Sequence, residues 1–200
     1  VSQFFPNNIT ILVGSRSQYV YAADHATMRR KGRMTEAQKR RLAEIDRLWQ
    51  PKPRAIETSF ARIAIETIRI ASAAPRPSLT LWTDEHKAYP RALARSNHLK
   101  RLLELGLIAH RTIPSRAART RANPLFPVNY LDRELRKDLH EHVRETVTFG
   151  RNVNRQMERL ALYLFWHNRM KPHRARGEPR SHAELAGADP STLLRDWAKV

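Results

Sequence analysis

An acidic pair stands where a short apolar stretch gives way to a helix-forming one. The stretch Leu79–Thr83 alternates apolar and hydroxyl side chains, which predicts a buried strand, and Asp84 and Glu85 follow it directly. A helix is expected behind them, with Pro90 in its first turn, where a proline is tolerated. Open α/β sheets bind ligands at the carboxyl ends of their strands. Asp84 is therefore a candidate ligand-binding carboxylate, and the alternative is an acidic turn that caps the following helix.

Several other polar side chains are expected to have structural roles. Glu85 follows Asp84, so a strand would direct it to the opposite face. His140 and His142 are two residues apart and would lie on different faces of a helix, which disfavours a shared metal. His167 and His173 are expected to pack or to lie at helix ends, where cationic groups are favoured.

The charge balance indicates a polyanionic partner. The chain has 37 Lys and Arg against 19 Asp and Glu, a formal net charge of +18 that is spread along its length. Such an excess is typical of nucleic-acid binding, and the alternative is a basic but unspecialised surface. The absence of cysteine excludes a disulfide framework and a zinc ribbon. Because no apolar run approaches ~18 residues and no signal peptide is recognised, we expect a cytoplasmic, nucleoid-associated protein with no membrane contact.

Two basic loops and one helix face are the candidate nucleic-acid contacts. The first, Met28–Arg33, is a short basic loop, and the second, Pro114–Arg121, is a basic loop with no apolar anchor. Each could contact phosphates, or could simply be solvated. The candidate side chains are Arg29, Arg30, Lys31, Arg116, Arg119, Arg121, Arg136 and His140.

The elements that must position these residues follow an α/β order. Apolar periodicity and turn residues predict, in chain order, a hairpin of strands Asn8–Val13 and Gln18–Asp24, helices Thr35–Trp49 and Arg54–Ala73, the strand before Asp84, a helix ending at Gly106, a strand Leu107–Ile113, and helices from Val128 and Val153. A further short helix is expected at most around Thr192–Ala198. Antiparallel strands followed by alternating strands and helices indicate a mixed sheet with helices on both sides.

Four segments together resemble bacterial insertion-sequence transposases of the DDE type. Thr83–Pro90 resembles their second acidic block, and Asn123–Tyr130 resembles the segment that introduces their last catalytic helix. His142–Phe149 is similar to their basic-Thr-aromatic signature, and Tyr163–His173 to their aromatic, Asn and Pro-His close. The resemblance covers Asn8–His173.

The resemblance implies a fold and a reaction. The fold would be ribonuclease H-like, with residues 1–173 as the catalytic core and residues 174–200 as a polar tail. The reaction would be the cleavage and transfer of DNA strands during transposition, assisted by two Mg²⁺ or Mn²⁺ ions held by carboxylates. The partners would be transposon ends and target DNA, bound by a homo-oligomer.

The resemblance also assigns site residues. Asp84 would be the second catalytic acid and a metal ligand, and Asn129 would occupy the last position, where the family usually has Glu. Asp132, one turn later, could substitute for Asn129. The first acid of the family lies on a strand before the hairpin, which Val1–Pro6 does not provide, and Asp24 is an alternative carboxylate. We therefore expect a fragment of a transposase that lacks the first acid and the DNA-reading segment.

Two other functions fit the same features. One is a non-enzymatic basic DNA-binding protein, or an inactive transposase relic that keeps the fold. The other is an RNA-binding accessory protein, for which only the charge argues.

Overall fold

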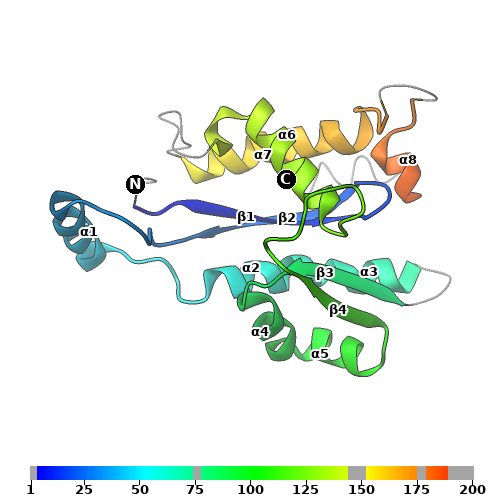
Figure 1. Ribbon diagram of the computed structural model, residues 1–200, viewed down its shortest axis with the longest axis horizontal. Coiled ribbons are helices and arrows are strands. Elements are labelled where there is room, and N and C mark those ends of the chain that lie inside the picture. Colours follow the sequence, from blue (N-terminus) through cyan, green and yellow to red (C-terminus); the bar gives the residue numbers. More distant parts are fainter. Residues whose placement is uncertain (1–3, 74–77, 144–151, 175–178, 189–200) are drawn as a thin grey trace.

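The described part of the chain contains two two-stranded sheets with helices packed against them. The computed structural model describes residues 4–73, 78–143, 152–174 and 179–188. In the antiparallel sheet, β1 (Asn7–Val13) pairs with β2 (Val20–Thr27), and in the parallel sheet, β3 (Leu79–Asp84) pairs with β4 (Ile108–Ile113). The helices are α1 (Glu36–Leu48), α2 (Ala55–Ala64), α3 (Glu66–Ala73), α4 (Ala88–Arg95), α5 (Asn97–Glu104), α6 (Phe126–Asp138), the 3₁₀ helix η1 (His140–His142), α7 (Val153–Arg169) and α8 (His182–Ala186) (Figure 1).

The hairpin of β1 and β2 has a helical layer on each side. Figure 1 shows α6 and α7 on one side of the hairpin and α2 on the other. On the first side, Ile9, Ile11 and Val13 pack against a buried cluster that contains Leu131 of α6 and Leu160 of α7. These are every second residue of β1, as expected when one face of a strand packs against one layer and the other face against another.

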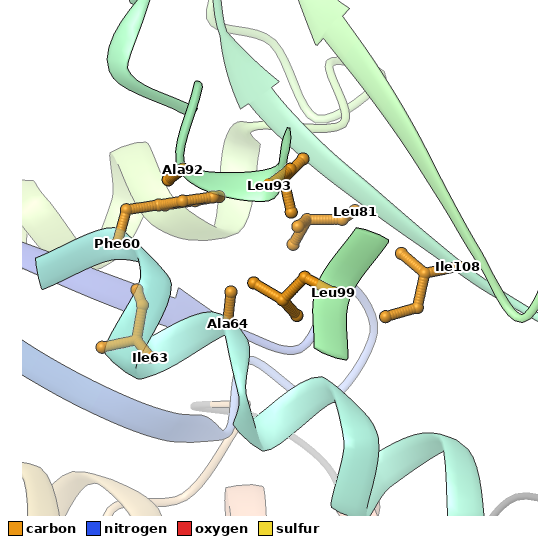
Figure 2. Close-up of a cluster of buried hydrophobic side chains, with 8 residues drawn as sticks. All are labelled: Phe60, Ile63, Ala64, Leu81, Ala92, Leu93, Leu99 and Ile108. Carbon is orange, nitrogen blue, oxygen red and sulfur yellow. The ribbon is translucent and has the colours of Figure 1, made fainter. Parts of the chain in front are cut away.

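A second buried cluster joins the two sheets on the α2 side. Figure 2 shows its eight side chains, which come from α2, β3, α4, α5 and β4: Phe60, Ile63, Ala64, Leu81, Ala92, Leu93, Leu99 and Ile108. Leu12 of β1 packs against this cluster. Next to Leu12, the Ser59 hydroxyl of α2 donates a hydrogen bond of 2.9 Å to Thr10, and both side chains are buried.

Local signals in the sequence set several helix boundaries. The spacing of Thr35 and Gln38 predicts a capping box, and the Thr35 hydroxyl and the Gln38 side chain form one at the start of α1. Gly106 has a φ of +68° after α5, the left-handed conformation expected of a glycine that ends a helix. Both predictions are confirmed.

Two predicted helices are each divided in the structure. The helix expected over residues 54–73 is interrupted at Ile65, where the Thr67 hydroxyl donates to the Ala64 carbonyl and so competes with the main-chain ladder. The helix expected after Asp84 is interrupted at Ser96, which is extended and whose hydroxyl accepts from the Leu99 amide at the start of α5.

The α/β class is confirmed, but the single mixed sheet is not seen among the described residues. β1 and β3 belong to separate sheets because the structure has no strand between them in the ranges it describes. In the same ranges, no helix is long and apolar enough to cross a bilayer. Most of the signature His142–Phe149 lies outside the described residues. The helix expected around Thr192–Ala198 lies entirely outside them.

Helix α8, in the segment expected as a polar tail, is tied to the hairpin by two buried histidines. His167 of α7 and His182 of α8 stack with their ring centroids 4.1 Å apart, and each is at most 1% exposed. His182 Nδ1 donates to the Ser17 carbonyl at 2.7 Å, and His167 Nε2 donates to the Gln18 carbonyl at 3.1 Å. Burial lowers the pKa of both imidazoles, that of His182 to about 4. The contact therefore requires neutral rings.

Acidification should weaken this contact. Because the pKa of His182 falls from its ordinary value of 6.5 to about 4 on folding, the unfolded chain binds the proton more readily. The stabilisation is complete above pH 6.5 and diminishes progressively as the pH falls towards about 4. Urea unfolding across this range should give a steeper decline of unfolding free energy for the wild type than for His182→Gln. The exposed His98→Gln variant is the control, and equal slopes for wild type and His182→Gln would contradict the assignment.

Candidate functional site

A groove of about 550 Å³ lies between β1 and β3 and is called the central groove below. Every residue from Asn8 to Val13 and every residue from Leu79 to Asp84 lines it. Apolar side chains of α2 and α3 contribute to one wall, and the start of α6 contributes to another. The groove therefore runs along two strands and includes the carboxyl end of β3.

The structure brings the three predicted catalytic residues to this groove. Asp84 is the last residue of β3, while Asn129 and Asp132 are one turn apart on α6, and all three line the groove. Each is partly exposed. Residues from two elements distant in sequence thus line the same groove, and Asp84 lies at the carboxyl end of a strand, where ligands bind in open α/β sheets.

The Asp84 carboxylate has a structural contact as well as access to the groove. Its Oδ1 accepts a hydrogen bond of 2.9 Å from the His86 amide, which closes the turn between β3 and α4. The acidic-turn interpretation and the ligand interpretation are therefore compatible at this residue.

The neighbouring Thr83 connects Asp84 to β4. The buried Thr83 hydroxyl donates to the Asp84 carbonyl at 2.9 Å, so it accepts from His110 Nε2, also at 2.9 Å. Burial lowers the pKa of His110 and so favours the neutral ring, and the hydrogen bond to Thr83 then places its proton on Nε2. This network fixes the end of β3 against β4.

Tyr89 borders the groove beside Asp84, and its position was not predicted as part of the site. Its ring packs on Phe60 with a centroid separation of 4.6 Å. Burial, and secondarily the charge of Asp84, raise the pKa of Tyr89 to about 12. The phenol is thus a constant hydrogen-bond donor near the groove at neutral pH. Its place in the Tyr-Pro pair after the acidic block was the available signal.

Glu85 has a contact of the structural kind expected for it. Its Oε2 accepts a hydrogen bond of 2.9 Å from the Ser115 amide. This bond joins the loop after β3 to the loop after β4 and so holds together the ends of the two parallel strands.

The carboxylates of the described residues do not make a complete metal-binding set. Asp132 pairs with Arg136 at 2.5 Å, and Asn129 contributes only an uncharged amide oxygen. Asp24 of β2 forms an ion pair of 3.4 Å with Arg62 of α2, and Asp24 does not line the central groove. Within the described ranges, no three His, Asp or Glu side chains are grouped in a way that could hold a metal ion.

The two basic loops differ in their relation to the groove. In the loop after β2, Arg29 forms a bidentate ion pair with Asp46 of α1, and Arg30 donates to the Arg33 carbonyl. In the loop after β4, Arg119 lines the groove, and Arg116 and Arg121 are exposed.

The remaining basic candidates either do not line the groove or form an ion pair with a carboxylate. Lys31 and His140 are exposed and do not line the groove. Arg136 is held by Asp132, and Arg16, which was not predicted, contributes to the groove lining. The second loop is therefore the better candidate for contacting a ligand in the groove.

Comparison of the sequence with protein-family models and with curated proteins gives no match, and comparison of the structure with solved structures gives none. The functional assignment therefore depends on the groove, its residues and the charge of the chain.

Two substitutions at Asp84 should separate its structural role from any chemical one. Asp84→Ala removes the acceptor for the His86 amide and should reduce the unfolding free energy by ~0.5–1.5 kcal/mol. Asp84→Asn keeps a side-chain oxygen acceptor and should stay within ~0.5 kcal/mol of the wild type. Urea unfolding measures both, and an Asn variant as unstable as the Ala variant would show that the turn needs the charge.

Proposed function

We propose that this chain is part of the catalytic domain of an insertion-sequence DDE transposase, with a ribonuclease H-like arrangement of its elements. The observation that supports the proposal is that Asp84, at the carboxyl end of β3, and Asn129 and Asp132 of α6 line one groove. The antiparallel hairpin, the parallel strand pair and helices on both sides of the hairpin agree with such a fold.

The proposal gives the groove residues different tasks. Asp84 would be the principal protein ligand of Mg²⁺ or Mn²⁺, since divalent ions of this type prefer carboxylate oxygens. The bound ions would activate the attacking oxygen and stabilise the leaving one. Asn129 would support the site through its amide oxygen, and Asp132 would replace it only after release from Arg136. The first acid would come from a strand that precedes the hairpin.

The proposed substrate is DNA. The net charge of +18 gives a strong attraction for phosphates, and the loop with Arg116, Arg119 and Arg121 opens onto the groove at Arg119. Because transposition joins two transposon ends to a target, the active form would be a homo-oligomer.

A second candidate is a basic DNA-binding protein without chemistry. The observation in its favour is the ion pair between Asp132 and Arg136. Of the two carboxylates that line the groove, only Asp84 then has no salt-bridge partner among the described residues. In that case the groove would be a relic, and the basic loops alone would matter.

A nicking assay on supercoiled plasmid tests the enzymatic proposal. In Mg²⁺ or Mn²⁺, the chain extended by its preceding strand should nick the plasmid, and Asp84→Asn should reduce the rate by roughly 10²-fold or more, since it removes a charged metal ligand. Glu44→Gln, an exposed change on α1, is the control. Metal-dependent nicking that Asp84→Asn leaves unchanged would refute the role of Asp84.

The salt dependence of DNA binding tests the role of the second basic loop. Replacing its three arginines by Gln should lower the magnitude of the slope of log K against log [salt] by about 1 for each phosphate that these arginines neutralise in the wild type. The substitutions are Arg116→Gln, Arg119→Gln and Arg121→Gln. A variant with the same charge change at arginines paired within their helices is the control: Arg41→Gln, Arg69→Gln and Arg155→Gln. Equal slopes for the two variants would mean that binding depends on net charge alone.

A further inference from the structure

The segment between β2 and α2, residues 28–54, is called the basic arm below. Figure 1 shows its helix, α1, at one end of the molecule, beyond the helices that cover the two sides of the hairpin. Within α1, Leu42 is the one buried side chain. No residue of the basic arm lines the central groove. The basic arm is therefore a surface element that stands apart from the candidate site.

The basic arm is nevertheless held in a fixed position at its base. The Arg30 amide donates a hydrogen bond of 2.7 Å to the Phe4 carbonyl, so the main-chain pairing of the hairpin continues past the end of β2. Trp49, which follows α1, packs edge-on against the buried Phe5 with the ring centroids 4.9 Å apart. Because the arm is ordered before it meets a partner, binding through it carries a small entropic cost.

The basic arm has a large share of the positive charge of the chain. Its 27 residues contain ten Lys and Arg against three Asp and Glu, a net charge of +7 out of the +18 of the chain. Each of the three acids pairs with a basic residue of the arm itself: Asp46 with Arg29, Glu36 with Lys39, and Glu44 with Arg41. The seven other basic side chains form no ion pair among the described residues: Arg30, Lys31, Arg33, Arg40, Arg47, Lys52 and Arg54.

The unpaired cations of α1 contrast with the basic residues of other helices. Every Lys and Arg of α2, α3, α4 and α6 forms an ion pair with a carboxylate. Arg40 and Arg47 of α1 are exposed and lie two turns apart, on the side of the helix away from the buried Leu42. Protein interfaces have an apolar centre that is depleted in charge, whereas phosphates are bound by Lys and Arg. This face of α1 therefore fits a phosphate backbone better than a protein partner.

From these observations we propose that the basic arm binds the phosphates of a nucleic-acid duplex, at a surface separate from the central groove. Contacts of Lys and Arg with phosphates position a protein on a duplex without reading its sequence. Each neutralised phosphate releases condensed counterions, so the contribution of the arm falls as the salt concentration rises. This inference rests on the nucleic-acid binding in the proposed function and not on its chemistry.

Binding of a fluorescent DNA duplex by the full chain tests the proposal. The affinity is measured in EDTA at several salt concentrations, so that neither a metal nor strand cleavage contributes. The arm variant carries Lys31→Gln, Arg40→Gln and Arg47→Gln, and the matched control carries Lys87→Gln, Arg101→Gln and Arg180→Gln. The three control residues are also exposed, form no ion pair among the described residues and do not line the groove.

The arm variant should bind the duplex roughly tenfold or more weakly than the control variant at about 0.1 M salt. The magnitude of its slope of log K against log [salt] should be smaller by about 2–3, because up to three phosphate contacts are lost. Both variants should keep the urea midpoint of the wild type, since exposed charges contribute little to stability. Equal affinities and equal slopes for the two variants would overturn the proposal.

Hydrogen exchange of the wild type gives a second readout that needs no variant. The duplex should slow amide exchange in α1, because bound phosphates oppose local opening of the helix. Exchange in α1 that the duplex leaves unchanged would also overturn the proposal.

A duplex of RNA in the same assay identifies the source of the phosphates. Weaker binding of the arm variant to duplex DNA supports both the arm and the proposed substrate. A loss for duplex RNA alone supports the arm and contradicts DNA as the substrate. A chain that binds DNA through the arm but does not nick plasmid supports the arm and refutes the enzymatic proposal, so the two failures give different results.

Discussion

The packing of helices against both faces of β1 is the constraint on which the remaining structure depends. Ile9 and Ile11 hold α6 and α7 on one side, and Leu12 and Thr10 hold α2 on the other. Because the stabilisation grows with the apolar area removed from water, a strand whose partly buried apolar side chains pack on both faces contributes more than one that packs on a single face. The cluster around Phe60 contains Leu81 of β3, so it places β3, which ends at Asp84, beside β1.

The same constraint explains where the candidate site lies. α6 packs on β1 through Leu131, so Asn129 and Asp132 of the same helix reach the groove beside β1. β3 reaches it through Leu81, which packs with Phe60 and Leu99. The convergence of Asp84 with the α6 residues is thus a product of apolar packing on two sides of one hairpin.

Sequence reasoning located the elements whose signals are local. The β-branched strands, the Thr35 capping box and the left-handed Gly106 are each specified within a few residues. The division at Ile65 was missed because it depends on one hydroxyl, that of Thr67, and not on apolar periodicity.

Features set by distant contacts could not be predicted in the same way. The sequence around His182 does not indicate that its ring stacks on that of His167. The sequence around Arg29 likewise does not indicate that Arg29 forms an ion pair with Asp46. At the site, the end of a strand and a family resemblance pointed to Asp84 and Asn129. The groove that they share, and Tyr89 beside it, follow from the packing of helices that no local pattern encodes.

The bonds between the hairpin turn and the last helices also bear on the order of events during synthesis. The Asn168 side chain binds both main-chain groups of Val20 across 148 residues, and His182 binds Ser17 across 165. Translation must therefore continue for 165 residues beyond Ser17 before this turn can bind His182. Until then, the apolar face of the hairpin that α7 covers remains in water, a period in which a nascent chain of this kind depends on chaperones and in which a prematurely terminated product would aggregate.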